Sequence, residues 1–137
     1  MKKSILTLVS ALALCGSALA QQGVSKDTLT LGSIQDLSGP LAGFGKQVRM
    51  GMMLAVDELN EQGGINGRKI TLKIEDSGYD PRKGVLAAQK LLTQDRIFSM
   101  IGTLGSVVSL ATIPLVLEKG VTHLSHRFKK RATGAAA

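Results

Sequence analysis

The sequence predicts an α/β fold with three layers, in which helices cover both faces of a parallel sheet in the order βαβαβαβ. Short segments in which apolar residues alternate with period two are separated by segments in which they recur every three to four residues. Glycine or proline residues mark most of the changes of period. A polar or small-residue loop follows each predicted strand, at the edge where open parallel sheets bind ligands.

The first half of the pattern contains two strands and a long helix. Residues 28–35 (TLTLGSIQ) alternate and carry β-branched side chains, which predicts the first strand. Residues 45–61 have the helical period, and Gly63 and Gly64 end the predicted helix. Residues 69–75 (KITLKIE) alternate as the second strand. The apolar face of the helix is expected to consist of Val48, Met52, Ala55, Val56 and Leu59.

The second half repeats the alternation of helix and strand. Asp80 and Pro81 predict the start of a second helix, since acidic groups and proline favour a helix N-terminus. Residues 97–102 (IFSMIG) are typical of a central strand covered on both faces. Residues 106–118 predict a third helix, and residues 121–124 begin a fourth strand. The buried side of the second helix is expected to consist of Val85, Leu86, Ala88, Leu91 and Leu92.

The two ends of the chain differ from the domain between them, which we assign to residues 21–124. Residues 1–20 contain a basic start, a short apolar run and a small-x-small sequence, which predicts a secretory signal peptide cleaved after Ala20. We therefore expect the protein in the periplasm, with no cysteine left for a disulfide. Residues 125–137 form a basic segment that is either an interaction tail or a disordered end after a truncation, and we favour the second interpretation.

The net charge of +7 does not indicate a nucleic-acid-binding protein. Two of the 17 basic residues lie in the predicted signal peptide and four in the tail, which leaves 11 basic and 10 acidic residues between them. One tyrosine and three phenylalanines provide almost no surface for stacking on bases. We expect no nucleic-acid partner.

The sequence also lacks the motifs that are typical of enzyme active sites. The loop at Gly45 and Lys46 lacks the first glycine and the hydroxyl residue of a phosphate-binding loop. Glu75, Asp76 and Asp80 are close enough in sequence to be paired catalytic carboxylates, but solvated loop groups and helix caps are the interpretation we favour. We expect neither an enzyme nor a bound metal ion or other cofactor.

The loop after the third predicted strand is the strongest candidate for a binding site. Thr103, Leu104, Gly105 and Ser106 connect that strand to the following helix. Their hydroxyls and backbone amides should face the ligand edge of the sheet, and a helix N-terminus with a serine suits a carboxylate. From these residues alone, Ser106 either binds an anion or only caps its own helix.

Five segments have specific glycine and proline spacings: SGPLAGFG, GMMLAVDELNEQGGINGRKI, EDSGYDP, IGTLGS and IPLVLEKGV. In this order they resemble the amino-terminal lobe of the type I periplasmic binding proteins, in particular the leucine/isoleucine/valine class that serves ABC importers. The resemblance covers residues 28–122. Because members of that family are longer, we expect this chain to be an incomplete amino-terminal lobe.

The resemblance implies a function and its site residues. In the family two lobes close on a ligand, and Ser106 matches the serine that holds the carboxylate of an amino acid, assisted by backbone amides of the 103–105 loop. Phe44 matches an aromatic residue that covers the ligand side chain, and Tyr79 lies in the second loop of the site. The implied partners are a small zwitterion such as leucine, isoleucine or valine and, in the full-length family, a membrane permease.

The resemblance also implies that the groups binding the ligand's ammonium lie in the missing part. We therefore expect the chain to be incompetent for binding. Two other classes of function stay open. The first is an exported, standalone binding or sensor module that dimerises through its open sheet edge, and it would show ligand-dependent stabilisation. The second is a small α/β enzyme, and it would need a turnover that Ser106→Ala or changes at Asp76 and Asp80 abolish.

Overall fold

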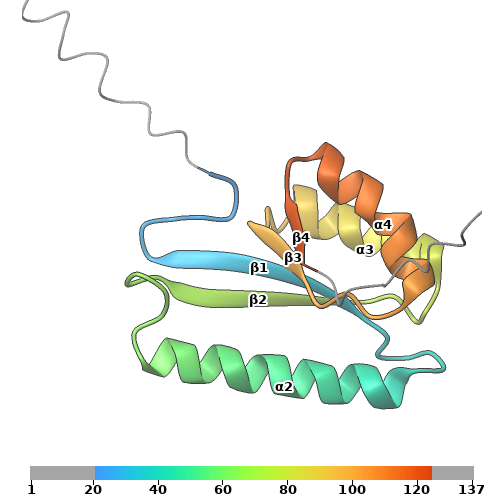
Figure 1. Ribbon diagram of the computed structural model, residues 1–137, viewed down its shortest axis with the longest axis horizontal. Coiled ribbons are helices and arrows are strands. Elements are labelled where there is room, and N and C mark those ends of the chain that lie inside the picture. The colour runs from blue at the N-terminus through green and yellow to red at the C-terminus, as the bar shows by residue number, and fades with distance from the viewer. Residues whose placement is uncertain (1–20, 125–137) are drawn as a thin grey trace, which may run out of the picture.

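The computed structural model describes residues 21–124, in which strands and helices alternate (Figure 1). The predicted signal peptide and basic tail lie outside the described residues. The elements are β1 (Thr28–Gln35), α2 (Ala42–Glu61), β2 (Lys69–Asp76), α3 (Pro81–Thr93), β3 (Ser99–Ile101), α4 (Ser106–Glu118) and β4 (Thr122–Leu124).

The strands form one parallel sheet in the order β2-β1-β3-β4, which confirms the predicted fold class. β1 pairs with β2 along its whole length, from Thr28 opposite Lys69 to Gln35 opposite Asp76. On its other side β1 pairs with β3 at Leu31 and Gly32. The loops that follow β1, β2 and β3 therefore emerge side by side at one edge of the sheet.

The helices form the two outer layers, with α2 on one face of the sheet and α3 and α4 on the other (Figure 1). Gly84 lets α3 approach α4 closely, because a Cβ there would lie 2.7 Å from Cγ1 of Val108. The hydrophobic core lies between these two helices and the sheet. Its fully buried members include Ile34, Leu91, Ile97, Met100, Val108 and Val116.

Helix α2 differs from its prediction in two respects. It begins at Ala42 rather than at residue 45, because the preceding turn is already held by the carboxylate of Asp36. Its predicted apolar face is only partly covered: Met52 and Val56 are half-buried, whereas Val48, Ala55 and Leu59 are exposed. The reason is that α2 lies alone on its face of the sheet in the part of the chain that the structure describes.

Helix α3 begins as predicted. Asp80 accepts hydrogen bonds from the amides of Arg82 and Lys83, and Pro81 occupies the first turn. The prediction that Leu86 is buried is wrong, since this side chain is exposed. At 3.6 residues per turn, position 86 lies on the side of the helix opposite to its buried residues. These are Gly84, Ala87, Ala88, Leu91 and Leu92.

Candidate functional site

The site predicted from the sequence lies where three loops meet at the carboxyl edge of the sheet. The loops comprise residues 36–41 after β1, 77–80 after β2 and 102–105 after β3. The second and third loops touch, since a Cβ on Gly105 would lie 2.7 Å from Cε2 of Tyr79. Phe44 lies on a separate element, in the first turn of α2, where its side chain is largely exposed.

The N-terminus of α4 has unused hydrogen-bond donors. The N-cap is Gly105, with φ 100° and no side-chain cap, so that Ser106 is the first helical residue rather than the cap. The first hydrogen bond to the cap joins the amide of Ser109 to the carbonyl of Gly105 at 2.9 Å. The amides of residues 106–108 therefore have no acceptor within the helix. Ser106 is exposed, and within residues 21–124 its hydroxyl makes no hydrogen bond.

The preceding loop uses part of its polar groups to maintain the fold. The amide of Leu104 donates to the carbonyl of Ile34 at 2.9 Å, which continues the sheet. Thr103 is buried, and its Oγ1 lies 3.3 Å from Nε2 of His123. Burial lowers the pKa of His123 below its ordinary value. The donors that remain for a ligand are therefore concentrated in the first turn of α4.

Tyr79 fixes the second loop against this helix terminus. Its backbone has φ 62°, in the left-handed region that non-glycine residues rarely adopt. The ring is half-buried and packs against Gly105, where the lack of a side chain makes room for it. The Tyr79 ring thus forms a wall beside the open amides of α4.

Asp36 closes the first loop on itself and Asp76 links the first two loops, and both roles were missed by reasoning from the sequence. Asp76 accepts hydrogen bonds from the amide of Leu37 at 2.8 Å, the hydroxyl of Ser38 at 2.5 Å and the amide of Gly78 at 2.8 Å. It therefore joins the first loop to the second. The sequence did contain a signal for these roles: an aspartate stands at the end of both β1 and β2 and is followed closely by serine and glycine, as in an Asx turn.

We predict that the protein loses stability in acid as Asp76 becomes protonated. Burial, the largest single influence, raises the pKa of Asp76, but the hydrogen bonds from Ser38, Leu37 and Gly78 and the charge of Lys83 together hold it below its ordinary value. A depressed folded-state pKa contributes stability that is present above the unfolded-state pKa and is lost as the pH falls through the folded-state value. Urea unfolding between about pH 6 and pH 2 measures this loss.

Asp76→Asn provides the comparison for this pH dependence. The difference in stability between the wild type and Asp76→Asn should shrink as the pH falls through that range. A stability difference that stays constant with pH would contradict the claim that protonation of Asp76 destabilises the protein in acid.

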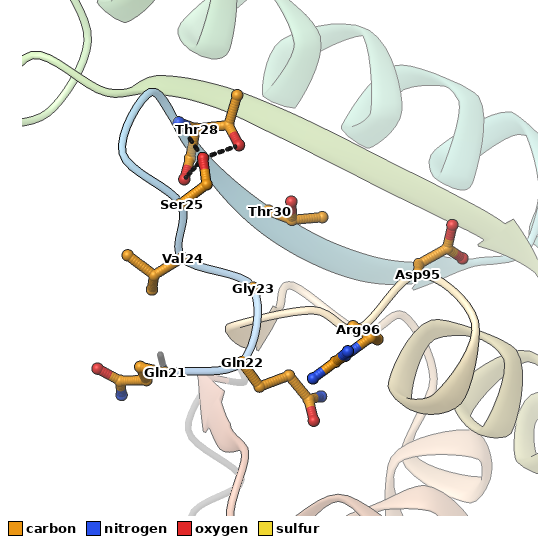
Figure 2. A pocket seen from close by; sticks show the side chains of 9 residues that line it. All are labelled: Gln21, Gln22, Gly23, Val24, Ser25, Thr28, Thr30, Asp95 and Arg96. Atoms are coloured by element: carbon orange, nitrogen blue, oxygen red, sulfur yellow. Dashed lines mark hydrogen bonds between the residues drawn. The ribbon is translucent and has the colours of Figure 1, made fainter. Parts of the chain in front are cut away.

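A hollow of about 310 Å³ lies at the opposite, amino edge of the sheet, between the segment before β1 and the loop after α3 (Figure 2). Three of its polar side chains bond to the protein: Gln22 donates to the carbonyls of Leu92 and Ile97, and Ser25 bonds to Thr28. The hollow contains none of the site residues predicted from the sequence. We therefore assign no site to it.

Among residues 21–124 no group of three or more His, Cys, Asp or Glu residues is arranged to hold a metal ion. None of the helices in this part of the chain combines the length and the apolar character needed to cross a membrane. The parallel α/β fold, with three loops gathered at the carboxyl edge of its sheet, belongs to the class of folds in which ligands bind at that edge.

Comparison with known proteins identifies the family. The model of the family described as "Periplasmic binding protein" matches residues 28–136. The chain belongs to this family. Because this is a family of binding proteins, the expectation that the chain is not an enzyme is confirmed. The match extends past residue 124, so the separate tail at residues 125–137 stays a prediction.

Three relatives illustrate the similarity. Leu/Ile/Val-binding protein BraC3 of Rhizobium johnstonii is 36% identical over 116 residues, which are 85% of this chain and 31% of the relative. LivJ of Streptococcus pneumoniae, solved with isoleucine, has a TM-score of 0.69 and 29% identity over 72% of this chain and 28% of its own. A solute-binding protein of Rhodopseudomonas palustris, solved with 3,4-dihydroxybenzoic acid, has a TM-score of 0.67 and 25% identity. The match covers 73% of this chain and 27% of that protein. The chain thus spans about a third of the length of the curated relatives it matches.

Proposed function

We propose that the protein is the substrate-binding component of an ABC importer and that its ligand is a branched-chain or related amino acid. The observation that carries this proposal is the first turn of α4, with three amides that lack an intrahelical acceptor and an exposed Ser106 hydroxyl. A helix N-terminus of this kind favours a carboxylate. The two ligands seen with solved relatives, isoleucine and 3,4-dihydroxybenzoic acid, both carry one.

The third loop holds the ligand carboxylate in this proposal. Ser106 donates its hydroxyl, and the amides at the start of α4 complete the set of donors. Gly105 makes room for the Tyr79 ring beside the helix terminus, since its position carries no side chain. Thr103 and Leu104 support the loop through their hydrogen bonds to His123 and Ile34. Each of these contacts keeps the helix terminus at the carboxyl edge of the sheet.

Aromatic side chains enclose the rest of the ligand. Tyr79 stands beside the carboxylate subsite because it packs against Gly105. Phe44 is exposed in the first turn of α2 and covers the ligand's apolar side chain. Both assignments follow the family resemblance, and the exposed ring of Phe44 is available for such a contact.

Each carboxylate in these loops already accepts backbone hydrogen bonds, including Asp80, which caps α3. Asp36 is fully buried and accepts hydrogen bonds from two amides, and Asp76 accepts three hydrogen bonds. We infer that these 137 residues alone bind the ligand weakly, with a dissociation constant of about a millimolar or more. Tight binding, closure and recognition by a membrane permease belong to a two-lobed protein.

The proposal places the protein in the periplasm, after removal of a signal peptide behind Ala20. The family's periplasmic setting and the basic, apolar character of residues 1–20 support this placement. Residues 21–124 then form the described lobe. Mass spectrometry of the exported protein tests the cleavage position, and a mature chain that begins at a residue other than Gln21 would contradict it.

We predict that leucine, isoleucine and valine raise the melting temperature of the full chain, whereas leucinamide, which lacks the carboxylate, does not. A ligand at ten times its dissociation constant stabilises the native state by about 1.4 kcal/mol. Ser106→Ala should reduce the rise because one donor to the carboxylate is lost. Thermal unfolding at increasing ligand concentration measures both effects.

The matched control is Ser25→Ala, which removes a hydroxyl from the opposite edge of the sheet. The rise in melting temperature that the ligand causes in Ser25→Ala, relative to the same variant without ligand, should equal the rise in the wild type. An equal response to leucine and leucinamide would contradict the carboxylate site. So would a full response in Ser106→Ala, or no response of the wild type to any of the three amino acids.

A further inference from the structure

The outer face of α2 carries large apolar side chains that the fold does not use. α2 lies alone on its side of the sheet, so its outer face points away from the rest of the described chain (Figure 1). Met50, Met53 and Leu54 are 71%, 45% and 61% exposed. At 3.6 residues per turn these three positions fall within an arc of about 100°. They form one continuous stripe on a face that is normally polar.

Charged residues are sorted along the same helix. Lys46 and Arg49 precede the apolar stripe, and Asp57, Glu58 and Glu61 follow it. None of the five takes part in the ion pairs found within residues 21–124, which are Lys73–Asp95 and Lys90–Glu75.

This order of charges is unfavourable for a single helix. Its positive residues lie toward the N-terminal end and its negative residues toward the C-terminal end, which opposes the helix dipole. Asp57 and Glu61, four residues apart, also repel each other. The pattern therefore reduces the stability of α2 in an isolated chain.

The stripe and the charges share one centre of symmetry. Met53 and Leu54 flank the midpoint, and Lys46 and Glu61 lie equally far from it on either side. At 3.6 residues per turn these two charged residues differ by only about 60° around the helix, so both lie on the side of the stripe. Arg49 and Glu58 lie on opposite sides of the helix and do not face each other. A second copy of α2 laid antiparallel across the midpoint would therefore place Lys46 of each copy opposite Glu61 of the other. Such an interface is self-complementary under two-fold symmetry.

We propose that the protein forms a two-fold symmetric dimer in which α2 packs antiparallel against α2 of a second copy. Met50, Met53 and Leu54 form its apolar centre, and basic and acidic residues pair at its two ends. The interface uses the side of α2 that faces away from the sheet, so the loops at the carboxyl edge do not enter it. The dimer is thus independent of the proposed ligand site.

Sedimentation equilibrium of the full chain over a range of concentrations tests the dimer. The wild type should show a monomer–dimer equilibrium. Lys46→Glu and Glu61→Lys each place like charges opposite one another twice in the dimer, and each should weaken it about tenfold. The double variant Lys46→Glu/Glu61→Lys should restore wild-type association. A mixture of the two single variants should associate more strongly than either alone.

Two further variants separate this interface from association through other exposed surfaces. Leu54→Lys, beside the midpoint, should abolish the dimer, because the two copies would bring two lysines together. Leu110→Lys alters a side chain on α4 that is 71% exposed and should leave association unchanged. Circular dichroism verifies that both variants remain folded. A monomeric wild type, unaffected single variants, a double variant that fails to recover, or a dimer lost in Leu110→Lys would each overturn the proposal.

Discussion

Gly45→Ala is expected to destabilise the protein by about 3 kcal/mol or more, because α2 meets the first loop backbone to backbone at this position. A Cβ on Gly45 would lie 1.8 Å from the carbonyl oxygen of Asp36 and 2.7 Å from its carbonyl carbon. Backbone atoms cannot rotate away as a flexible side chain can. The helix or the loop must therefore shift, which also displaces Phe44. Urea unfolding followed by circular dichroism measures the loss.

Gly51→Ala is the matched control in the same helix. A Cβ at this position meets no atom within 4 Å, and alanine favours a helix over glycine by about 0.5–1 kcal/mol. The control should therefore be more stable than the wild type. If Gly45→Ala and Gly51→Ala behaved alike, close approach of α2 to Asp36 would not be the reason for glycine at position 45.

Asp36→Ala is expected to cost about 3 kcal/mol, because it removes the fully buried carboxylate that accepts from two amides of the turn. The Asp36 side chain is fully buried and accepts hydrogen bonds from the amides of Gly39 at 2.6 Å and Leu41 at 2.7 Å. These bonds position the turn that leads into α2. Asp36→Asn retains an acceptor oxygen and should lose less. The free energy of unfolding in urea distinguishes the two variants.

Asp80→Ala is the control for the contribution of burial. Asp80 also accepts two backbone hydrogen bonds, from Arg82 at 2.7 Å and Lys83 at 3.1 Å, but it is exposed. Water can replace its oxygen as acceptor, so the loss should be clearly smaller than for Asp36→Ala. Equal losses in the two variants would refute the claim that burial makes the Asp36 turn critical.

Most of the fold could be predicted because the hydrophobic period changes clearly along the chain. The first strand was predicted at residues 28–35 and is found as Thr28–Gln35. The third strand is shorter than its apolar segment 97–102, since its pairing with β1 is limited to Ser99 and Met100. An apolar segment shows that a region is buried, but the neighbouring strand decides where pairing begins and ends.

The links between the loops could not be predicted from local patterns. Asp76 bonds to Leu37 and Ser38, almost forty residues earlier, and this contact depends on β2 lying beside β1. The packing of Tyr79 against Gly105 likewise depends on the arrangement of three strands. The sequence indicated which residues lie in the loops, whereas their mutual contacts follow from the order of the sheet.

The central claim is that the N-terminus of α4 holds the carboxylate of the ligand. Its most direct test is a titration of the ¹⁵N-labelled full chain with leucine and, separately, with leucinamide, followed by NMR. We predict that leucine shifts the amide resonances of residues 106–108 most strongly and that leucinamide leaves them nearly unchanged. Equal shifts with both compounds, or leucine-dependent shifts concentrated at Gln22 and Arg96 on the opposite edge, would contradict the account.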